Sequence, residues 1–503
     1  MSLAILYSRA QEGIQAPLVT VEVHLSNGLP GLSIVGLPEM AVRESKDRVR
    51  GALINSQFEF PARRITINLA PADLPKEGGR FDLPIALGIL AASNQLAADP
   101  LNHYEFTGEL ALSGEMRPIN GILPVALTAR DAGRSLILPQ QNAEEAGLVS
   151  GLQCYPAKHL LEVCSHINSV NQLEQFKSVR SPANATTKHQ LDMADVYGQS
   201  HARRALEISA AGAHSLLYIG PPGTGKSMLA SRLPGILPPM SEEEALECAA
   251  IHSVANNRAF QPAQWRQRPY RAPHHTASAA ALVGGGSNPK PGEISLAHCG
   301  VLFLDELPEF DRHTLEVLRE PLENGRITIS RANRQVDYPS RFQMIAAMNP
   351  CPCGHLGDGS NRCHCTLDRI TRYRNRISGP LLDRIDMHVE VPRQPLQINQ
   401  ESPTLEEPSE AIRRRVIEAR EIQLQRQGCT NQALQGLQIE QVANPGKEGN
   451  ALLHRAIEKL GLSMRAYHRI LKVARTIADL EGSPKVETAH ISEAIGYRRL
   501  DRR

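Results

Sequence analysis

The sequence predicts an α/β protein with three parts: an amino-terminal α+β domain, an α/β core and a carboxy-terminal helical lid. The core is predicted by an apolar strand, Leu216 to Ile219, that runs directly into the glycine-rich loop GPPGTGKS at 220–227. A second apolar run, VLFLDE at 301–306, ends in two acidic residues. Strands that precede helices in this order indicate a largely parallel sheet. Helical periodicity beyond residue 409 predicts the lid.

Size and composition fit this division. A chain of 503 residues has room for roughly three domains, and its 41% hydrophobic and 21% charged residues are ordinary for globular proteins. The net charge of +2 neither requires nor excludes a polyanionic partner. Leu3 to Tyr7 is apolar without a basic region before it, so we expect no signal peptide. The longest apolar run, Ile85 to Ala92, is too short to cross a bilayer. We therefore expect a cytoplasmic protein without membrane contact.

Alternating apolar residues organise the amino-terminal domain, expected at 1–170. Period-two alternation and apolar runs predict strands at Thr20 to Leu25, Ile65 to Leu69 and Ser135 to Leu138, and a buried helix at Leu83 to Leu96. The residues that follow are polar and nearly free of aliphatic side chains. We interpret 171–195 as a linker.

The core is expected at 196–392 and the lid at 393–503. A polar, proline-containing crossing from Gln394 to Ser409 separates them. Within the lid, apolar residues recur at helical spacing over 464–480, and Ser463 is suited to cap that helix.

The residue types of the glycine-rich loop suit a cradle for phosphates. Glycines let the backbone turn tightly with its N–H groups pointing inward, Lys226 can reach the β- and γ-phosphates, and Ser227 can bind Mg²⁺. The strand before the loop and the helix after it argue against a chance match. The residues expected to bind ATP here are Gly220, Pro221, Pro222, Gly223, Thr224, Gly225, Lys226 and Ser227.

Polar residues end two further apolar strands. Asp305 can hold Mg²⁺ through water, and Glu306 is suited to orient and deprotonate an attacking water. The strand Gln343 to Met348 ends at Asn349, whose amide could sense the γ-phosphate, although Asn-Pro is also an ordinary turn. Together these residues predict ATP hydrolysis with Mg²⁺.

Four of the nine cysteines lie within 351–365, a predicted insertion in the core. Cys351, Cys353, Cys363 and Cys365 offer the four sulfurs of a structural Zn²⁺ site. Because Cys-x-Cys is tighter than the usual spacing, His355 or His364 could replace one sulfur, and free cysteines are the alternative. The arginine-rich segment up to residue 384 suggests either DNA contact or a subunit interface. His274 and His275 are too isolated to predict a metal site.

The block RAPHHTASAAALVGGGSNPKPGEISLAHCGVLFLDELPEF at 271–310, with NPCPCGHLG at 349–357, resembles the magnesium-chelatase-like AAA+ family. Within that family, the chain is similar over almost its full length to the ComM/YifB proteins. The resemblance implies an AAA+ core, Asn349 as sensor 1, Arg384 as the arginine finger that reaches the next protomer's nucleotide, and Arg465 as sensor 2. From spacing alone, each of these arginines would be a surface salt-bridge residue. The resemblance also implies a homo-hexameric ring, probable ATP-dependent assembly and a DNA helicase that promotes branch migration in natural transformation.

The related MCM helicases share this layout. The likeness implies that 325–341 is a hairpin whose tip carries Arg331 and Arg334 into the ring channel, where they could grip DNA phosphates. An ordinary solvated hairpin tip is the alternative. Residues 281–292 would form a second loop insertion, with Lys290 as its cation.

The amino-terminal domain resembles the proteolytic domain of Lon, an S5 domain 2-like fold, through 74–91 and 112–133. The positions of Lon's serine nucleophile and lysine base are Arg80 and Leu123 here. Arginine cannot act as the nucleophile and leucine cannot take a proton. We therefore expect the fold without the protease.

Three classes of function remain open. The first is a hexameric motor that hydrolyses ATP and moves on single-stranded or branched DNA. The second is a chelatase-type ATPase subunit that remodels a protein partner, against which the Lon-like domain and the basic hairpin argue. The third is a DNA-binding scaffold whose ATP site only gates assembly, and the intact Asp305–Glu306 pair argues against it.

Overall fold

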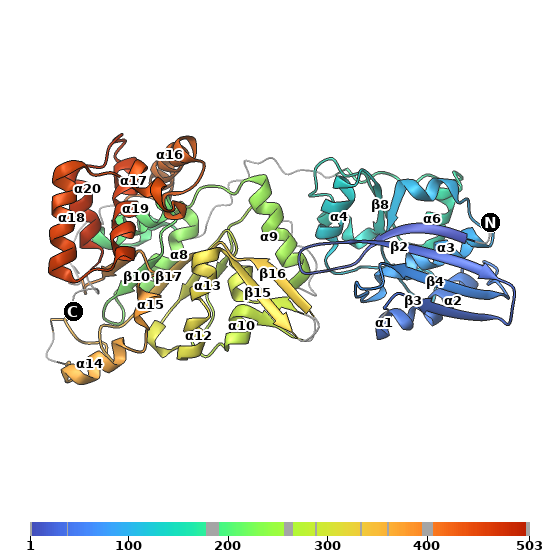
Figure 1. Ribbon diagram of the computed structural model, residues 1–503, viewed down its shortest axis with the longest axis horizontal. Coiled ribbons are helices and arrows are strands. Elements are labelled where there is room, and N and C mark those ends of the chain that lie inside the picture. Colours follow the sequence, from blue (N-terminus) through green and yellow to red (C-terminus); the bar gives the residue numbers. More distant parts are fainter. Residues whose placement is uncertain are drawn as a thin grey trace. The chain divides into compact units, whose positions relative to one another are not determined.

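The computed structural model describes residues 3–37, 39–177, 191–255, 265–286, 289–331, 334–359, 362–394 and 406–498. The chain forms two compact units, whose elements are labelled in Figure 1. The first comprises Met1–Thr186 and Glu242–Trp265, and the second comprises Thr187–Ser241 and Arg266–Arg503. Among the described residues, none of the helices combines the length and apolar character that a bilayer-spanning segment needs.

The first unit is built on a seven-stranded mixed sheet. Its order is β3 (Gly31–Val35), β4 (Arg64–Ala70), β2 (Leu18–Ser26), β1 (Leu3–Arg9), β5 (Tyr104–Phe106), β8 (Ser135–Pro139) and β9 (Cys154–Ala157). β2 pairs antiparallel with β1 and β4, and the other neighbours pair parallel. β6 (Glu109–Leu110) and β7 (Met116–Arg117) form a separate short hairpin.

Helices complete the first unit. They are α1 (Met40–Arg43), α2 (Ser45–Asn55), α3 (Asp82–Ala92), α4 (Ile122–Asp131), α5 (Ala143–Ala146), α6 (Leu160–Ile167) and α9 (Glu242–Ala255). Every residue of α3 is buried, and the helix packs on β1 and β2. The predicted strands of this unit appear as β2, β4 and β8, and the predicted buried helix ends slightly early, because Asn94 adopts a left-handed conformation at φ 62°.

Helix α9 lies far along the sequence from the rest of the first unit. Ala250 belongs to the same apolar cluster as Ile122 and Leu123 of α4. The carbonyl of Ser253 accepts a hydrogen bond from the backbone of Gly121 at 3.1 Å. The expected core, 196–392, therefore differs from the observed unit, because the small apolar face of α9 packs on α4.

The second unit contains a five-stranded parallel sheet. Its order is β11 (Tyr270–Arg271), β14 (Val301–Leu304), β17 (Gln343–Met348), β10 (Leu216–Ile219) and β18 (Met387–Glu390). β10, β14 and β17 are buried along their whole length, which matches their apolar sequences. Because all strands run in the same direction, the residues that follow them meet at one edge of the sheet.

Helices and hairpins surround this sheet. The helices are α7 (Ser200–Gly212), α8 (Lys226–Ile236), α10 (Ala279–Val283), α11 (Glu293–Leu296), α12 (Arg312–Glu316), α13 (Arg319–Asn324), α14 (Leu367–Arg374) and α15 (Gly379–Leu382). The hairpins are β12 (Gly284–Gly285) with β13 (Lys290–Pro291), and β15 (Arg326–Arg331) with β16 (Arg334–Pro339).

In the described part of the segment expected to form the lid, there are five helices: α16 (Ser409–Gln427), α17 (Leu437–Val442), α18 (Gly446–Leu460), α19 (Met464–Leu480) and α20 (Thr488–Gly496). In Figure 1 they gather as one orange-to-red group. α16 packs on α7 and α8, and α19 packs on α7. The side chain of Ser463 accepts a hydrogen bond from the backbone of Ala466 and caps α19, as its sequence predicts.

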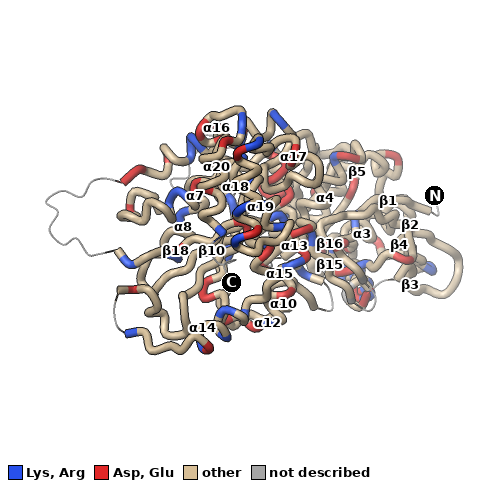
Figure 2. The backbone as a smooth tube through the Cα atoms, turned by 60° about the vertical axis from the view of Figure 1, so that its left-hand side comes forward, with Lys and Arg blue, Asp and Glu red and all other residues tan. Residues whose placement is uncertain are grey.

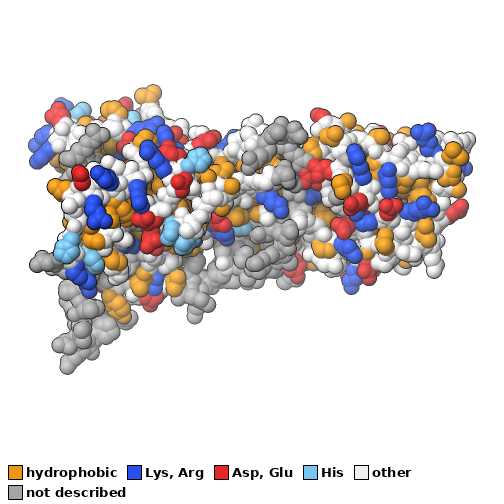
Figure 3. Space-filling view, turned by 90° about the horizontal axis from the view of Figure 1, so that it is seen from below, with side chains coloured by type: hydrophobic (Ala, Val, Ile, Leu, Met, Phe, Trp, Pro, Cys, Tyr) orange, Lys and Arg blue, Asp and Glu red, His pale blue; other side chains and the backbone are white. Residues whose placement is uncertain are grey.

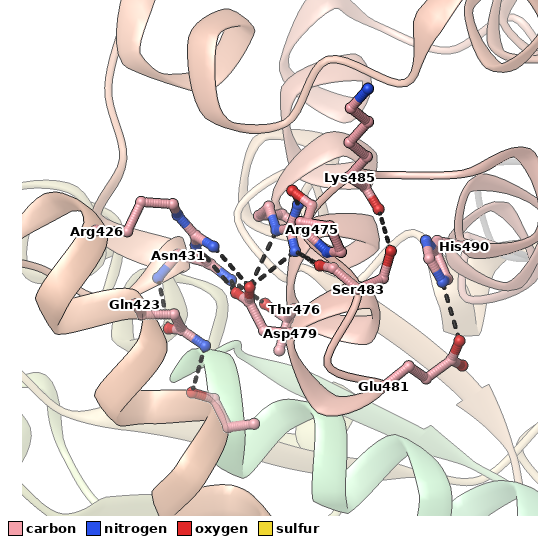
Figure 4. Close-up of polar contacts among 12 residues, drawn as sticks. Gln423, Arg426, Asn431, Arg475, Thr476, Asp479, Glu481, Ser483, Lys485 and His490 are labelled. Atoms are coloured by element: carbon pink, nitrogen blue, oxygen red, sulfur yellow. Dashed lines mark hydrogen bonds and ion pairs between the residues drawn. The ribbon is translucent and has the colours of Figure 1, made fainter.

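A buried carboxylate organises the interior of the lid (Figure 4). Asp479 accepts hydrogen bonds from Arg426 at 2.6 and 3.0 Å, from Arg475 at 2.9 and 3.1 Å, and from the amide of Asn431 at 2.8 Å. Buried charges are tolerated when they are paired in this way. The Asn431 amide also donates to the hydroxyl of Thr476, and that hydroxyl lies 2.7 Å from Nε2 of His214. His214 lies two residues before β10. The network therefore joins the lid to the sheet.

Candidate nucleotide-binding site

The glycine-rich loop connects β10 to α8, which begins at Lys226. Gly223 and Gly225 have φ values of +74° and +88°, a left-handed region that favours glycine. Gly220 is required for a different reason, because a Cβ there would lie 2.2 Å from the carbonyl oxygen of Val391. The loop therefore exposes the backbone at the amino end of α8, where unpaired N–H groups and the helix dipole favour a phosphate.

Lys226 lies over this loop. Its ammonium donates hydrogen bonds to the carbonyls of Gly220 at 2.7 Å and Pro221 at 2.8 Å, and it approaches the Asn349 side-chain oxygen at 3.4 Å. Burial lowers the pKa of Lys226, while Asp305 and Glu306 act in the opposite direction. The lysine, the acidic pair and Asn349 therefore belong to one electrostatic cluster.

The serine that follows the lysine contacts the acidic strand. Ser227 donates a hydrogen bond from its hydroxyl to Asp305 at 2.6 Å. A hydroxyl and a carboxylate at a helix amino terminus form a donor set that suits Mg²⁺ bound to a nucleotide. The residues present therefore fit the expected metal.

Glu306 has an unusual backbone. Its φ is 51°, in the left-handed region that non-glycine residues seldom adopt and that recurs at functional sites. Its carboxylate lies 3.2 Å from Nδ1 of His275. His275 follows β11, the strand next to β14, and its ring packs on that of His274 with centroids 4.1 Å apart.

His275 is the residue that sequence reasoning missed at this site. Its only signal was its position after a short strand, since neighbouring parallel strands deliver their following loops to the same edge. The two-residue length of β11 hid that signal. The structure thus brings together Lys226, Ser227, Asp305, Glu306 and Asn349, with His275 added.

The two arginines of interest lie together elsewhere in the second unit. Arg384 contacts Glu323 of α13 at 2.7 Å, and Arg465 approaches the same carboxylate oxygen at 3.3 Å. Arg384 is buried and also donates to the Pro380 carbonyl at 2.7 Å. Burial of Glu323 acts in the opposite direction, but Arg384 holds the pKa of that carboxyl below its ordinary value. One carboxylate therefore anchors both guanidinium groups.

The four cysteines form a compact cluster. The Sγ atom of Cys351 lies 3.4 Å from that of Cys353 and 3.8 Å from that of Cys363, and Cys353 lies 3.7 Å from Cys363. All four ligand sulfurs, including that of Cys365, lie within 4.8 Å of one another, and none forms a disulfide. A tetrahedral Zn²⁺ with bonds of about 2.3 Å requires sulfurs about 3.8 Å apart. The cluster therefore has the dimensions of a zinc site with four cysteine ligands.

The arginine-rich segment after the cysteines is largely used within the chain. Arg374 donates to the Pro350 carbonyl at 3.3 Å, and Arg376 pairs with Glu309 at 2.9 Å. Arg372 keeps 84% of its side chain exposed. Figure 2 shows Lys and Arg interspersed with Asp and Glu along the chain, and the face in Figure 3 likewise mixes both signs. Contact with a nucleic acid would thus depend on small local groups of Lys and Arg side chains.

The two hairpins of the second unit contact each other. The hydroxyl of Tyr338, on β16, donates to the carbonyl of Pro289 at 2.9 Å, beside β13. Arg331 and Arg334 are paired at the tip of β15 and β16 by their backbones. Their side chains lie outside the described residues, so their predicted contact with DNA stays a prediction.

In the first unit, Arg80 and Leu123 are interior residues. Leu123 is fully buried. Arg80 donates to the Gln11 side chain at 2.6 Å and to the Asn120 carbonyl at 3.1 Å, and burial lowers the pKa of Arg80 to about 10. The structure therefore gives Arg80 an internal structural contact, and the Lon-like fold stays a prediction.

Three segments of the chain match family models. Residues 192–399 match "Magnesium chelatase, subunit ChlI", residues 21–142 match "Subunit ChlI of Mg-chelatase", and residues 406–498 match "Magnesium chelatase, subunit ChlI C-terminal". The matched segments include every residue of the candidate nucleotide site.

Full-length relatives are also found. The chain is 54% identical to "Competence protein ComM" of Haemophilus influenzae, over 100% of this chain and 98% of the relative. It is 53% identical to "Uncharacterized protein YifB" of Salmonella typhimurium, with the same coverage. The similarity to "Magnesium-chelatase 67 kDa subunit" of Heliobacterium mobile is 27%, over 40% of this chain and 33% of that protein.

Proposed function

This chain belongs to the ComM/YifB family of magnesium-chelatase-like proteins, and from that membership we propose that it is an AAA+ ATPase that works on DNA. In this proposal, six copies form a ring, hydrolyse ATP and act as a helicase that promotes branch migration of recombination intermediates during natural transformation. The name of the Haemophilus relative supports the link to competence.

One observation carries the ATPase part of the proposal: the contact between Ser227 and Asp305 at 2.6 Å. This contact joins the glycine-rich loop at 220–227 to Asp305, which follows β14 at the carboxyl edge of the parallel sheet. Ser227 and Asp305 would hold Mg²⁺, which when bound neutralises charge on the nucleotide phosphates. Lys226 would bind the β- and γ-phosphates.

Glu306 and Asn349 act on the attacking water in this proposal. Glu306 would take up its proton, and the Asn349 amide would orient it toward the γ-phosphate. His275 would hold the Glu306 carboxylate through their 3.2 Å contact. Precise orientation of this kind accounts for a large share of enzymatic rate enhancement.

A neighbouring protomer of the ring would supply the remaining positive charge at the nucleotide. Arg384 and Arg465 share Glu323, so we assign both to one place, the nucleotide of the adjacent protomer. A finger that acts across an interface requires a head-to-tail arrangement, which forms a ring when the rotation between neighbours closes. In the ring, the two guanidinium groups would leave Glu323 and bind the phosphates instead. Nucleotide binding would then be coupled to the contacts between neighbouring protomers.

DNA would be held by the paired hairpins. The Tyr338–Pro289 hydrogen bond makes β12–β13 and β15–β16 one structural unit, and Arg331, Arg334 and Lys290 supply its positive charge. Cations on such a loop bind phosphates without regard to sequence.

The experiment that tests the proposal is ATP turnover with single strands, forks and four-way junctions, together with mass measurement in ATP and ADP. We expect turnover to rise with branched DNA and the hexamer to be favoured by ATP. Turnover that ignores every DNA substrate would contradict the DNA part alone. ATP binding without turnover would favour the scaffold.

We also propose that Cys351, Cys353, Cys363 and Cys365 bind a structural Zn²⁺. Support comes from the sulfur separations of 3.4–3.8 Å. Four thiolates close the site to substrate, so the metal would stabilise the loop and would not contact the nucleotide.

The alternative is a chelatase-type ATPase subunit that remodels a protein partner. The family models favour it to some degree, since all three are described for chelatase subunits. The amino-terminal unit does not separate the two functions, because residues 21–142 also match such a model. A chain that ignores DNA but hydrolyses ATP faster with a metal-inserting protein partner would establish this alternative.

A further inference from the structure

We propose that the zinc centre is a working part of the ATPase. It would fasten the end of β17 to the start of α14 and so hold Asn349 against the phosphate loop. ATP turnover would then require the metal, whereas nucleotide binding would not. This inference rests on the proposed ATPase function and on the proposed Zn²⁺.

The four cysteines lie at the two ends of one loop. Cys351 and Cys353 follow Asn349 directly, after β17 ends at Met348. Cys363 and Cys365 directly precede Thr366, whose side chain accepts a hydrogen bond from the backbone of Arg369 and caps α14. A metal bound by both pairs therefore crosslinks the strand that carries the catalytic amide to the helix that follows.

Helix α14 returns to the same strand end. Arg374 donates two hydrogen bonds of 3.3 Å to the carbonyl of Pro350. The hydroxyl of Tyr373 faces the backbone of Asn349, whose N–H acts to lower the pKa of Tyr373 against the larger, opposite effect of burial. Tyr373 is buried and lies one residue from Arg374, so neighbouring side chains of α14 both face the backbone that follows β17. The segment between β17 and α14 is held at both ends and at the catalytic residue.

The cysteine loop also packs against the phosphate loop. Gly354 has φ +81° and its backbone N–H donates to the carbonyl of Cys351 at 3.0 Å. A Cβ at Gly354 would lie 2.9 Å from Cδ of Pro222 and 3.9 Å from Cγ of Asn349. The turn that carries the first two ligands therefore approaches both the nucleotide cradle and the amide expected to orient water.

Loss of the metal would loosen this assembly. Without a crosslink, the loop regains backbone conformational freedom. Most structural zinc sites owe their order to the metal itself. Asn349 would keep its place directly after β17 but lose its second support through α14, and misplacement by about 1 Å can cost about 100-fold in rate. Lys226 and the loop backbone, which bind phosphates, would remain on α8.

The test compares Cys363→Ser with Cys429→Ser, a half-buried cysteine in the lid, outside the cluster. Zinc content, affinity for a fluorescent ATP analogue and ATP turnover are measured on the full-length chain. We expect Cys363→Ser to lose zinc and at least tenfold in turnover, with nucleotide affinity within threefold of the unchanged chain. Cys429→Ser should match the unchanged chain in all three.

Two further measurements guard against simple misfolding. Zinc removed from the unchanged chain with a chelator should abolish turnover, and added Zn²⁺ should restore it. Tyr373→Phe should keep its zinc and still lose turnover, since it removes only the hydroxyl next to Asn349.

The outcomes separate this inference from the proposed function. An unchanged chain that hydrolyses ATP at the same rate with and without zinc would overturn the inference alone, as would full turnover by Tyr373→Phe. A zinc-loaded chain that never hydrolyses ATP would overturn the proposed ATPase and the inference with it. An unchanged chain that hydrolyses ATP but binds no zinc would overturn the metal site.

Discussion

Arg384 forms an ion pair with Glu323 at 2.7 Å, and Arg465 shares the same carboxylate oxygen at 3.3 Å. Spacing alone would make both arginines ordinary salt-bridge residues. Both do form ion pairs, and their convergence on one half-exposed acid places the two guanidinium groups side by side. Arg384 is buried against that acid, and we propose that the nucleotide of a neighbouring protomer takes the place of Glu323.

Arg384→Ala should reduce ATP turnover by about 10³-fold, the usual effect of removing an arginine finger, while nucleotide affinity stays within a few-fold. Arg376→Ala is the matched control, because Arg376 forms an exposed ion pair with Glu309. This variant should retain turnover. Steady-state ATPase assays at saturating ATP measure both.

The trans arrangement makes a separate prediction. Rings mixed from Arg384→Ala and Lys226→Ala chains should regain part of the lost turnover, since some interfaces then combine an intact finger with an intact phosphate loop. Neither variant should be active by itself. Mixtures that stay as inactive as the separate variants would show that Arg384 does not act across an interface.

His275→Ala should lower turnover about tenfold and leave ATP affinity unchanged, because it removes the group that holds the Glu306 carboxylate. His313→Ala, an exposed histidine on α12, serves as the control. Equal rates for His275→Ala and the unchanged chain would remove His275 from the site.

Asp479→Asn should destabilise the lid by about 3–5 kcal/mol, the usual cost of leaving buried charges without their partner. Arg426 and Arg475 both lose their ionised acceptor in this variant. Glu481→Gln, two residues further on and half exposed beside His490, should change the unfolding free energy by less than about 1 kcal/mol. Chemical denaturation gives the unfolding free energy of both variants. Similar losses would contradict the prediction that the buried Asp479 carboxylate stabilises the lid more than the Glu481 carboxylate does.

His388 predicts a pH dependence of stability. Burial, with Arg498 and Arg469 nearby, lowers the pKa of His388 well below its ordinary value. Below about pH 6.5 the unfolded chain therefore takes up a proton that the folded chain does not. The free energy of unfolding should fall as the pH falls from 7.5 to 5.5, by at most about 1.4 kcal/mol per pH unit from this residue.

The variant His388→Gln should show a shallower loss of stability over that range than the unchanged chain, and His313→Gln should keep the full slope. Denaturant titrations at several pH values provide the free energies. Identical slopes for all three chains would contradict the role of His388.

Much of the fold follows from apolar pattern. Leu216–Ile219 is almost entirely apolar, and Gln343–Met348 is apolar after its first residue. Both runs therefore predict buried strands, and both predictions were confirmed. The cap at Ser463 follows equally from residue type. These features depend on local sequence, and local physics suffices to predict them.

Other features depend on contacts between distant segments. α9 lies inside the sequence of the core yet packs on α4, because its small residues fit a surface that no local pattern reveals. His275 reaches Glu306 only through the order of strands in the sheet. The shared anchor of Arg384 and Arg465 likewise joins residues that are distant in sequence, through Glu323.

We propose that ATP hydrolysis beside the Ser227–Asp305 contact drives movement on DNA. Strand displacement from a labelled four-way junction tests it most directly, with the unchanged chain, Lys226→Ala and Glu306→Gln compared at equal concentration. We predict that the unchanged chain separates the strands only with ATP and Mg²⁺, and that both variants fail. Displacement that persists in Lys226→Ala would contradict the account.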